Sequence, residues 1–165
     1  MALADALLPE FDHEITTTRK LLERVPDDRL TWKPHVRSMS LGGLATHLSN
    51  IPWWGQMTLA QPEFDTAGVG TQPEAATRAE ILRTFDRNAF ATRALLQGKS
   101  DAELMAPWTL KRGDQTIFSM PKAAVWRSFV LSHLVHHRGQ MSVYLRLLDV
   151  PVPSIYGPSA DEGGF

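Results

Sequence analysis

Apolar residues recur at helical spacing in four long segments of the chain. These segments span about residues 3–25, 40–60, 77–98 and 121–148. Residues suited to helix ends lie at their limits: Ser40 is a suitable N-cap, Thr77 with Glu80 can form a capping box, and Pro121 suits a first helical position. The pattern therefore predicts four amphipathic helices.

The segments between these helices differ in length and character. Residues 61–76 are rich in proline, glycine and threonine and show no apolar period, so we expect a long surface connection. Residues 100–105 favour a short helical turn, and strand-like residues around 112–114 predict a small irregular hairpin before the last helix. We expect an all-α fold, a four-helix bundle with a long crossover, in which residues 1–165 form a single domain.

Composition narrows the classes of function. The chain has 165 residues, 43% of them hydrophobic, and a formal net charge of -1, which offers no field for a nucleic-acid backbone. Cysteine is absent, so any metal must be held by nitrogen or oxygen. No signal sequence or long apolar run occurs, and we expect a soluble, cytoplasmic protein with neither a nucleic-acid partner nor a membrane segment.

Histidine spacing provides the main chemical signal. His133 and His137 are four residues apart, so on a helix they lie about 40° apart on one face and can reach one ion. His47 lies on an apolar stripe of the second helix and can meet the pair across the bundle. Three imidazoles with open coordination positions are the ligand set of catalytic zinc sites, and they suit several other transition metals.

Other residues are candidates for the surroundings of this site. His136 lies to one side of the pair and is interpreted as a supporting or interface residue, whereas His13 should be solvated and His35 belongs to a loop. Further candidates for orienting a ligand or shaping a pocket are Asn50, Trp54, Gln140 and Tyr144.

Several common sites are excluded by their missing motifs. Leu134 follows His133, so this is not an H-E-x-x-H metalloprotease helix. The one Glu-x-x-His pair, Glu10 with His13, lies away from the cluster, whereas a di-iron site of the ferritin type needs two such pairs. The sequence also lacks a phosphate-binding loop, a G-x-S-x-G elbow and zinc-finger spacing.

Three stretches carry a family resemblance: Trp32-Lys-Pro-His, the run from Ser40 to His47, and His133-Leu-Val-His-His-Arg-Gly-Gln140. Together they resemble the DinB/YfiT-like family, whose members are regarded as metalloenzymes, over nearly the whole chain. The resemblance implies an up-down-down-up four-helix bundle, commonly dimeric, with a divalent metal on His47, His133 and His137. Characterised relatives include transferases of thiols such as bacillithiol, mycothiol or glutathione, and a thiol-dependent maleylpyruvate isomerase.

Our leading hypothesis is transfer of a low-molecular-weight thiol to an electrophilic small molecule, with zinc or nickel as the expected metal. One alternative is hydrolysis by metal-activated hydroxide. Another is a non-catalytic, stress-related metal-binding bundle, which would show a fourth protein ligand such as His136 or His35 and no cavity. An apolar flank of the last helix, formed by Leu131, Leu134 and Leu145, is expected to be exposed and to favour a homodimer.

Overall fold

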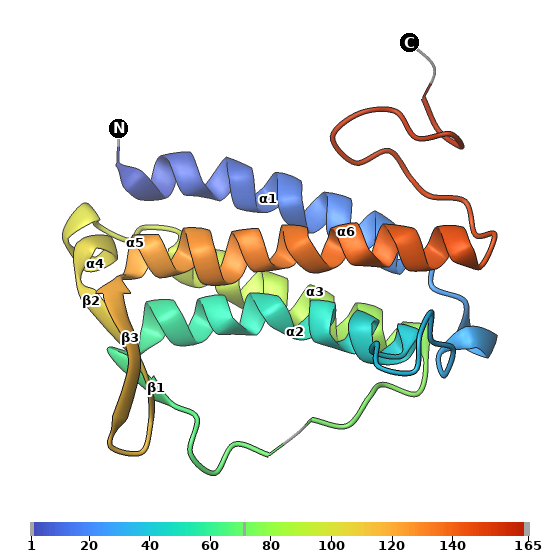
Figure 1. The fold of residues 1–165 in the computed structure, drawn as a ribbon. Coiled ribbons are helices and arrows are strands. Elements are labelled where there is room, and N and C mark those ends of the chain that lie inside the picture. The colour runs from blue at the N-terminus through green and yellow to red at the C-terminus, as the bar shows by residue number, and fades with distance from the viewer. Residues whose placement is uncertain (1, 71, 164–165) are drawn as a thin grey trace.

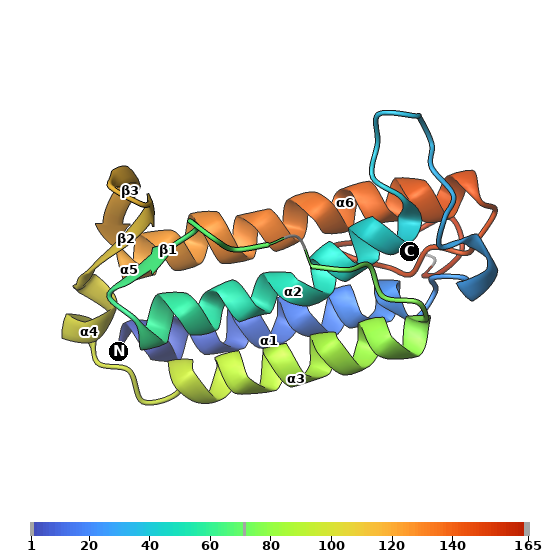
Figure 2. The same cartoon turned by 90° about the horizontal axis from the view of Figure 1, so that it is seen from below.

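The computed structural model of the protein describes residues 2–70 and 72–163. Four long helices lie side by side, with α1 and α6 running in one direction and α2 and α3 in the other (Figure 1, Figure 2). Helices α3 and α6 each contact both α1 and α2. The bounds of these helices are α1 Leu3–Leu22, α2 Leu41–Ala60, α3 Arg78–Leu96 and α6 Ser132–Leu147.

The helix starts follow the capping residues in the sequence. The Ser40 hydroxyl accepts a hydrogen bond from the backbone N–H of Gly43 at 2.8 Å, and the Thr77 hydroxyl accepts one from Glu80 at 3.2 Å. The Glu80 carboxylate accepts from the N–H of Ala76, one residue before the cap. Both predicted N-caps are therefore confirmed, while the return bond of a regular capping box is shifted by one residue.

The last long helix is not regular throughout. It begins as α5 (Lys122–Val125), continues as a π-helical segment (Trp126–Leu131) and then becomes α6. In the π-helical segment the hydrogen bonds run to the residue five positions earlier, which leaves a bulge in the helix. The Ser132 hydroxyl, just after it, donates to the carbonyl of Arg127 at 2.8 Å. The apolar period predicted a long helix here but gave no sign of the π turn.

A three-stranded sheet lies at one end of the helices (Figure 1). Its strands are β1 (Glu63–Asp65), β2 (Pro107–Arg112) and β3 (Gln115–Pro121). The β2–β3 pair is the predicted hairpin, antiparallel with an irregularity between Leu110 and Lys111, and β1 pairs with β2 in parallel. The molecule is therefore mostly helical with a mixed sheet, and the expected all-α bundle is not confirmed. Strand β1 was missed because it lies in a segment of the long connection with no apolar period.

The sheet is attached to the helices by its own small core. Trp108, Leu110 and Val125 are buried together, and the indole N–H of Trp108 donates to the carbonyl of Met57 in α2 at 3.2 Å. The short helix α4 (Asp101–Met105), capped by Ser100, precedes β2 and confirms the predicted helical turn. The strands thus lie at the end of the long helices where α2 finishes.

The apolar flank expected on the surface is in fact part of the core. Leu131 is 4% exposed, and Leu134 and Leu145 are fully buried. The reason is that α6 packs against both α1 and α2, so its buried arc is wider than a single stripe. These three leucines give no support to a dimer interface. Within the described residues, no helix is both long and apolar enough to cross a membrane.

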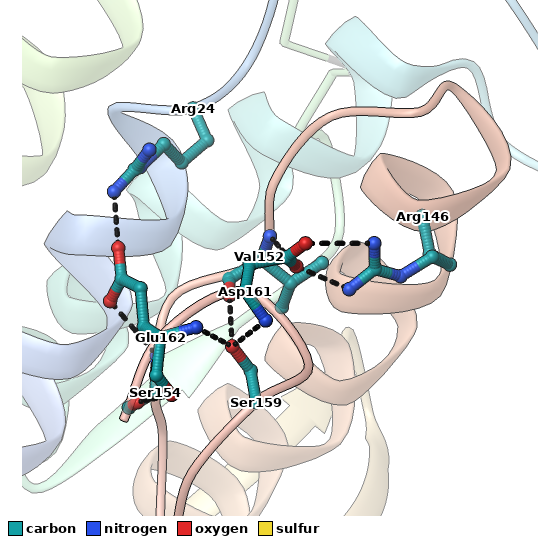
Figure 3. Close-up of polar contacts among 7 residues, drawn as sticks. All are labelled: Arg24, Arg146, Val152, Ser154, Ser159, Asp161 and Glu162. Carbon is teal, nitrogen blue, oxygen red and sulfur yellow. Dashed lines mark hydrogen bonds and ion pairs between the residues drawn. The ribbon is translucent and has the colours of Figure 1, made fainter. Parts of the chain in front are cut away.

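The tail after α6 folds back over the helices and is held by polar contacts (Figure 3). Asp161 accepts hydrogen bonds from Arg146 of α6 and from the backbone N–H of Val152, while Glu162 pairs with Arg24 beyond the end of α1. The tail lies on the α1 side of α6 (Figure 1). The opposite side of α6, which faces α2, carries the histidines.

Candidate metal centre

Three histidine side chains meet where α2 and α6 face each other. His47 projects from α2, and His133 and His137 project from α6. The Nε2 atoms of His47 and His133 are 3.0 Å apart, and the ring centroids of His47 and His137 are separated by 4.4 Å. One nitrogen of each ring lies within 4.8 Å of the corresponding nitrogens of the other two. The structure thus brings together the three predicted residues, which form a group able to hold a metal ion.

The helix packing explains how the histidines reach this position. The most deeply buried stripe of α6 consists of Leu134, Arg138, Met141 and Leu145. His133 and His137 each precede a member of that stripe, so they lie on its α2 side and are half-buried. They therefore lie at the edge of the core.

Burial and crowding keep these imidazoles neutral. Burial lowers the pKa of His47 to about 4, with smaller contributions from His137 and His133. Burial also lowers the pKa values of His133 and His137 below the usual value. A neutral imidazole keeps a lone pair on one ring nitrogen, and this is the form that binds metals.

A glutamine one turn along α6 orients one of the rings. The Nδ1 of His137 and the Oε1 of Gln140 are 2.7 Å apart, and the amide nitrogen of Gln140 lies 3.1 Å from the Nε2 of His136. If Nδ1–H of His137 donates to the amide oxygen, its Nε2 carries the lone pair. The structure therefore places Gln140 and His136 beside the triad, with His136 outside the group of three.

The nitrogens of the triad are poorly partnered by the protein alone. Only one proton can be shared between the two Nε2 atoms of His47 and His133. The buried Nδ1 of His133 has no well-aligned hydrogen-bond acceptor among the described residues. The nearby backbone of Phe129 raises the pKa of His133, but by less than burial lowers it. Two nitrogens bound tetrahedrally to zinc at about 2.0–2.1 Å would lie roughly 3.4 Å apart. This is close to the 3.0 Å between the Nε2 atoms of His47 and His133. The donor set therefore fits a divalent transition metal.

A cleft of about 410 Å³ opens beside His47 along α2. The long connection forms its other wall, contributing Val69, Gln72 and Glu74. Two tryptophans of α2, Trp53 and Trp54, line the end nearer the sheet. A small molecule in this cleft would therefore lie against one member of the triad.

The remaining predicted residues differ in their placement. Asn50 and Trp54 line the cleft, but the Asn50 amide donates to the Thr46 carbonyl of its own helix. Tyr144 lies away from the triad, with its ring against Trp32 and its hydroxyl donating to the carbonyl of Met39 at 3.3 Å. The loop residue His35 is exposed and outside the histidine group, and His13 is solvated as expected.

Two charged residues near the site were not singled out from the sequence. Glu74 lines the cleft, although it lies in a loop with no pattern to mark it. Arg138, next to His137, is 1% exposed and pairs with the buried Glu14 of α1 at 2.6 Å. Arg138 stands on the same helical stripe as Leu134, Met141 and Leu145, and this spacing could have identified it as buried.

Comparison with known proteins assigns the chain to a family. The chain is 27% identical over 162 residues to the uncharacterized protein YrdA of Bacillus subtilis strain 168, covering 96% of this chain and 90% of that protein. A DinB-like protein of Bacillus cereus ATCC 10987 has a TM-score of 0.72 at 21% identity, covering 92% of this chain and 97% of the other. A DinB-like protein of Exiguobacterium sibiricum 255-15 has a TM-score of 0.64 at 17% identity, with 90% and 94% covered. The sequence model of the DinB family matches residues 2–163. The chain therefore belongs to the DinB family.

Proposed function

We propose that the protein is a divalent-metal-dependent enzyme in which His47, His133 and His137 hold the ion. One observation carries this proposal: three neutral imidazoles converge at the edge of a cleft, and no fourth histidine or carboxylate of the described chain joins the group. Three protein ligands leave coordination positions open, as in catalytic metal sites. Zinc and nickel are the expected metals, since both accept imidazole nitrogen.

The reaction we propose is transfer of a low-molecular-weight thiol to an electrophilic small molecule. A bound divalent ion would lower the pKa of a coordinated thiol and so supply a nucleophile near neutral pH. The sulfur then forms a bond to the electrophilic carbon, the leaving group departs with its electron pair, and the thiol proton passes to solvent. Gln140 keeps His137 oriented during this step, and Trp53 and Trp54 provide an apolar wall for the electrophile.

Two other functions use the same residues. Hydrolysis by activated water needs the same three histidines but no thiol, so dependence on added thiol separates it from transfer. A non-catalytic metal-binding protein should have a closed coordination sphere and no cavity. Neither His136 nor His35 belongs to the histidine group, and a cleft adjoins it, which favours an enzyme.

Metal binding is tested first. Protein purified without an affinity tag is analysed for its elements, alongside His137→Ala and the matched control His13→Ala. We expect about one equivalent of zinc or nickel in the wild type and in the control, and a large loss in His137→Ala. Equal metal content in all three proteins would contradict the proposed ligand set.

Turnover is tested with bimane fluorescence. Monochlorobimane is incubated with the protein and with glutathione, cysteine or bacillithiol in turn. We expect conjugation that depends on both thiol and metal, lost in His137→Ala and kept in His13→Ala. Turnover without thiol would favour hydrolysis, and turnover unaffected by His137→Ala would reject the metal role.

The proposal extends to the assembly. We infer that the four long helices form the up-down-down-up bundle of the family resemblance, with the sheet as an addition, and that two copies form a homodimer in the cytoplasm. Val143 and Leu147, each 57% exposed on α6, are apolar residues available to such an interface. Sedimentation equilibrium measures the mass; a monomer at micromolar concentration would reject the dimer.

A further inference from the structure

The cleft beside the triad is lined by two kinds of residues. Its apolar lining consists of Met39, Trp53, Trp54 and Val69, and its polar lining includes Thr46, Asn50, Gln72 and Glu74. Trp53 and Trp54 are half-buried, and their rings stand edge-to-face with centroids 5.2 Å apart. Two partly exposed tryptophans form a surface on which an apolar or aromatic group can pack.

Glu74 lies at the other end of this cleft and is held in place there. Its Oε2 accepts a hydrogen bond from the Ser40 hydroxyl at 2.7 Å. Its Oε1 lies over Gly43, where a Cβ atom would come within 2.7 Å of that oxygen. Because residue 43 has no side chain, the carboxylate can rest against the first turn of α2, whose exposed N–H groups favour negative charge.

Within the described part of the chain, this carboxylate has no cation to balance it. Among residues 2–70 and 72–163, Glu74 takes part in no ion pair, and it is the sole acidic or basic lining residue besides His47. Glu74 is exposed and lines the cleft, so a ligand can reach it. The protein groups that line the cleft therefore contribute one fixed negative charge.

The residues on α2 give the cleft its length. Gly43, His47, Asn50 and Trp54 follow one another at intervals of four, three and four residues, and so lie along one face of the helix. With a rise of 1.5 Å per residue, the carboxylate end lies about 6 Å along the helix from His47, and Trp54 lies about 10 Å from His47 on the other side. A ligand that spans the cleft therefore passes His47.

We propose that this cleft selects small organic cations, binding an ammonium group at Glu74 and an apolar or aromatic body against Trp53 and Trp54. As a statement about the substrate class of the site, it rests on the proposed function, but binding of the cation itself requires no metal. The tryptophan faces strengthen the same preference, because aromatic rings attract cations. Neutral or anionic molecules of the same shape bind less well.

The test uses three probes of equal length that differ in charge: 4-phenylbutylamine, 4-phenylbutanol and 4-phenylbutyrate. Affinities are measured by calorimetry with the full chain, first free of metal and then loaded with zinc. Tryptophan indole N–H signals, assigned with Trp→Phe variants, locate the bound probe. We expect the amine to bind the metal-free protein about tenfold more tightly than the alcohol, to exceed the acid by more, and to shift the signals of Trp53 and Trp54.

Glu74→Gln keeps the size and the hydrogen-bonding capacity of the side chain and removes its charge. We expect this variant to bind the amine and the alcohol equally, while Glu23→Gln, a matched change at the exposed residue that follows α1, keeps the tenfold preference. Equal binding of the three probes to the wild type, no binding at all, or a preference that survives Glu74→Gln would overturn the inference. An amine preference in a protein that binds no metal would reject the proposed function alone, whereas metal-dependent thiol transfer without that preference would reject this inference alone.

Discussion

At the scale of single residues, the side chain of Gln140 makes the most direct supporting contact with the histidine group. It bridges His137 and His136 through the two atoms of its amide. A hydrogen bond to the outer nitrogen of a metal-binding histidine fixes the ring and raises its affinity for the ion. Gln140 is thus expected to act through His137 and not by touching the metal.

We predict that Gln140→Ala lowers zinc affinity by about 10- to 100-fold, as the loss of such supporting contacts does in other metal sites. Competition with a chromophoric chelator measures the change. Gln97→Ala, at the end of α3, is the control and should bind zinc like the wild type. An affinity unchanged by Gln140→Ala would show that the ring needs no support from this amide.

The low pKa of His47 predicts how stability varies with pH. In the unfolded chain this histidine takes up a proton as the pH falls through about 6.5, whereas in the folded protein it resists protonation down to about pH 4. The metal-free protein should therefore lose stability as the pH falls from 6.5 toward 4, and His133 and His137 act in the same direction. Urea unfolding at a series of pH values should show a shallower loss for His47→Gln, with His13→Gln following the wild type.

Gly55 controls the contact of α2 with its neighbours at the scale of helices. A Cβ atom at this position would lie 2.6 Å from the Cγ2 of Thr92 on α3 and 3.1 Å from the ring of Trp126. Both neighbours are fully buried, so neither can move away without disturbing the core. The close approach of α2 to α3 thus depends on the missing side chain.

Gly55→Ala should lower the free energy of unfolding by about 1–3 kcal/mol through overpacking. Adding Thr92→Ser removes the clashing methyl group, keeps the hydroxyl bonded to the carbonyl of Pro52, and should recover part of the loss. Gly139→Ala, with open space around it on α6, is the control and should gain about 0.5–1 kcal/mol. Denaturant titrations measure all four proteins, and an unchanged Gly55→Ala would contradict the overpacking.

The sequence predicted the helices well because their apolar period and caps are local properties. It placed His133 and His137 together for the same reason, since spacing on one helix needs no tertiary knowledge. His47 needed both the helical stripe and the family resemblance. Three features could not be predicted in this way: how deeply His133 and His137 are buried, the burial of Leu134 and the position of Glu74. They depend on which helices pack side by side and on the path of a loop, and a local sequence pattern contains no information on either.

At the scale of the whole molecule, the C-terminal tail connects helices α1 and α6. The Tyr156 hydroxyl donates to Glu14 of α1 at 2.9 Å and accepts from Arg138 of α6. Burial and the nearby Glu14 raise the pKa of Tyr156, so the hydroxyl keeps its proton at neutral pH. The contact closes a buried ion pair on the side of α6 that faces away from the triad.

Tyr156→Phe should lower the free energy of unfolding by about 1–2 kcal/mol, because Glu14 and Arg138 lose a partner in a largely buried place. Tyr144→Phe removes the chain's other tyrosine hydroxyl, which donates at 3.3 Å to an exposed backbone carbonyl, and should change stability by less than about 0.5 kcal/mol. Zinc affinity should be unaffected in both. A larger loss in Tyr144→Phe than in Tyr156→Phe would reverse this ranking.

The π-helical segment Trp126–Leu131 also determines the rotational phase between the two halves of the last helix. Its wider turn holds one more residue than an α-helical turn, so the two halves keep nearly the rotation of a regular helix that is one residue shorter. If the same residues formed a regular α-helix, everything after the segment would turn by about 100° relative to the part attached to the sheet. That helix would keep either the packing of Trp126 or the approach of His133 and His137 to His47, but not both, so this one wide turn couples the anchoring of the sheet to the assembly of the histidine group.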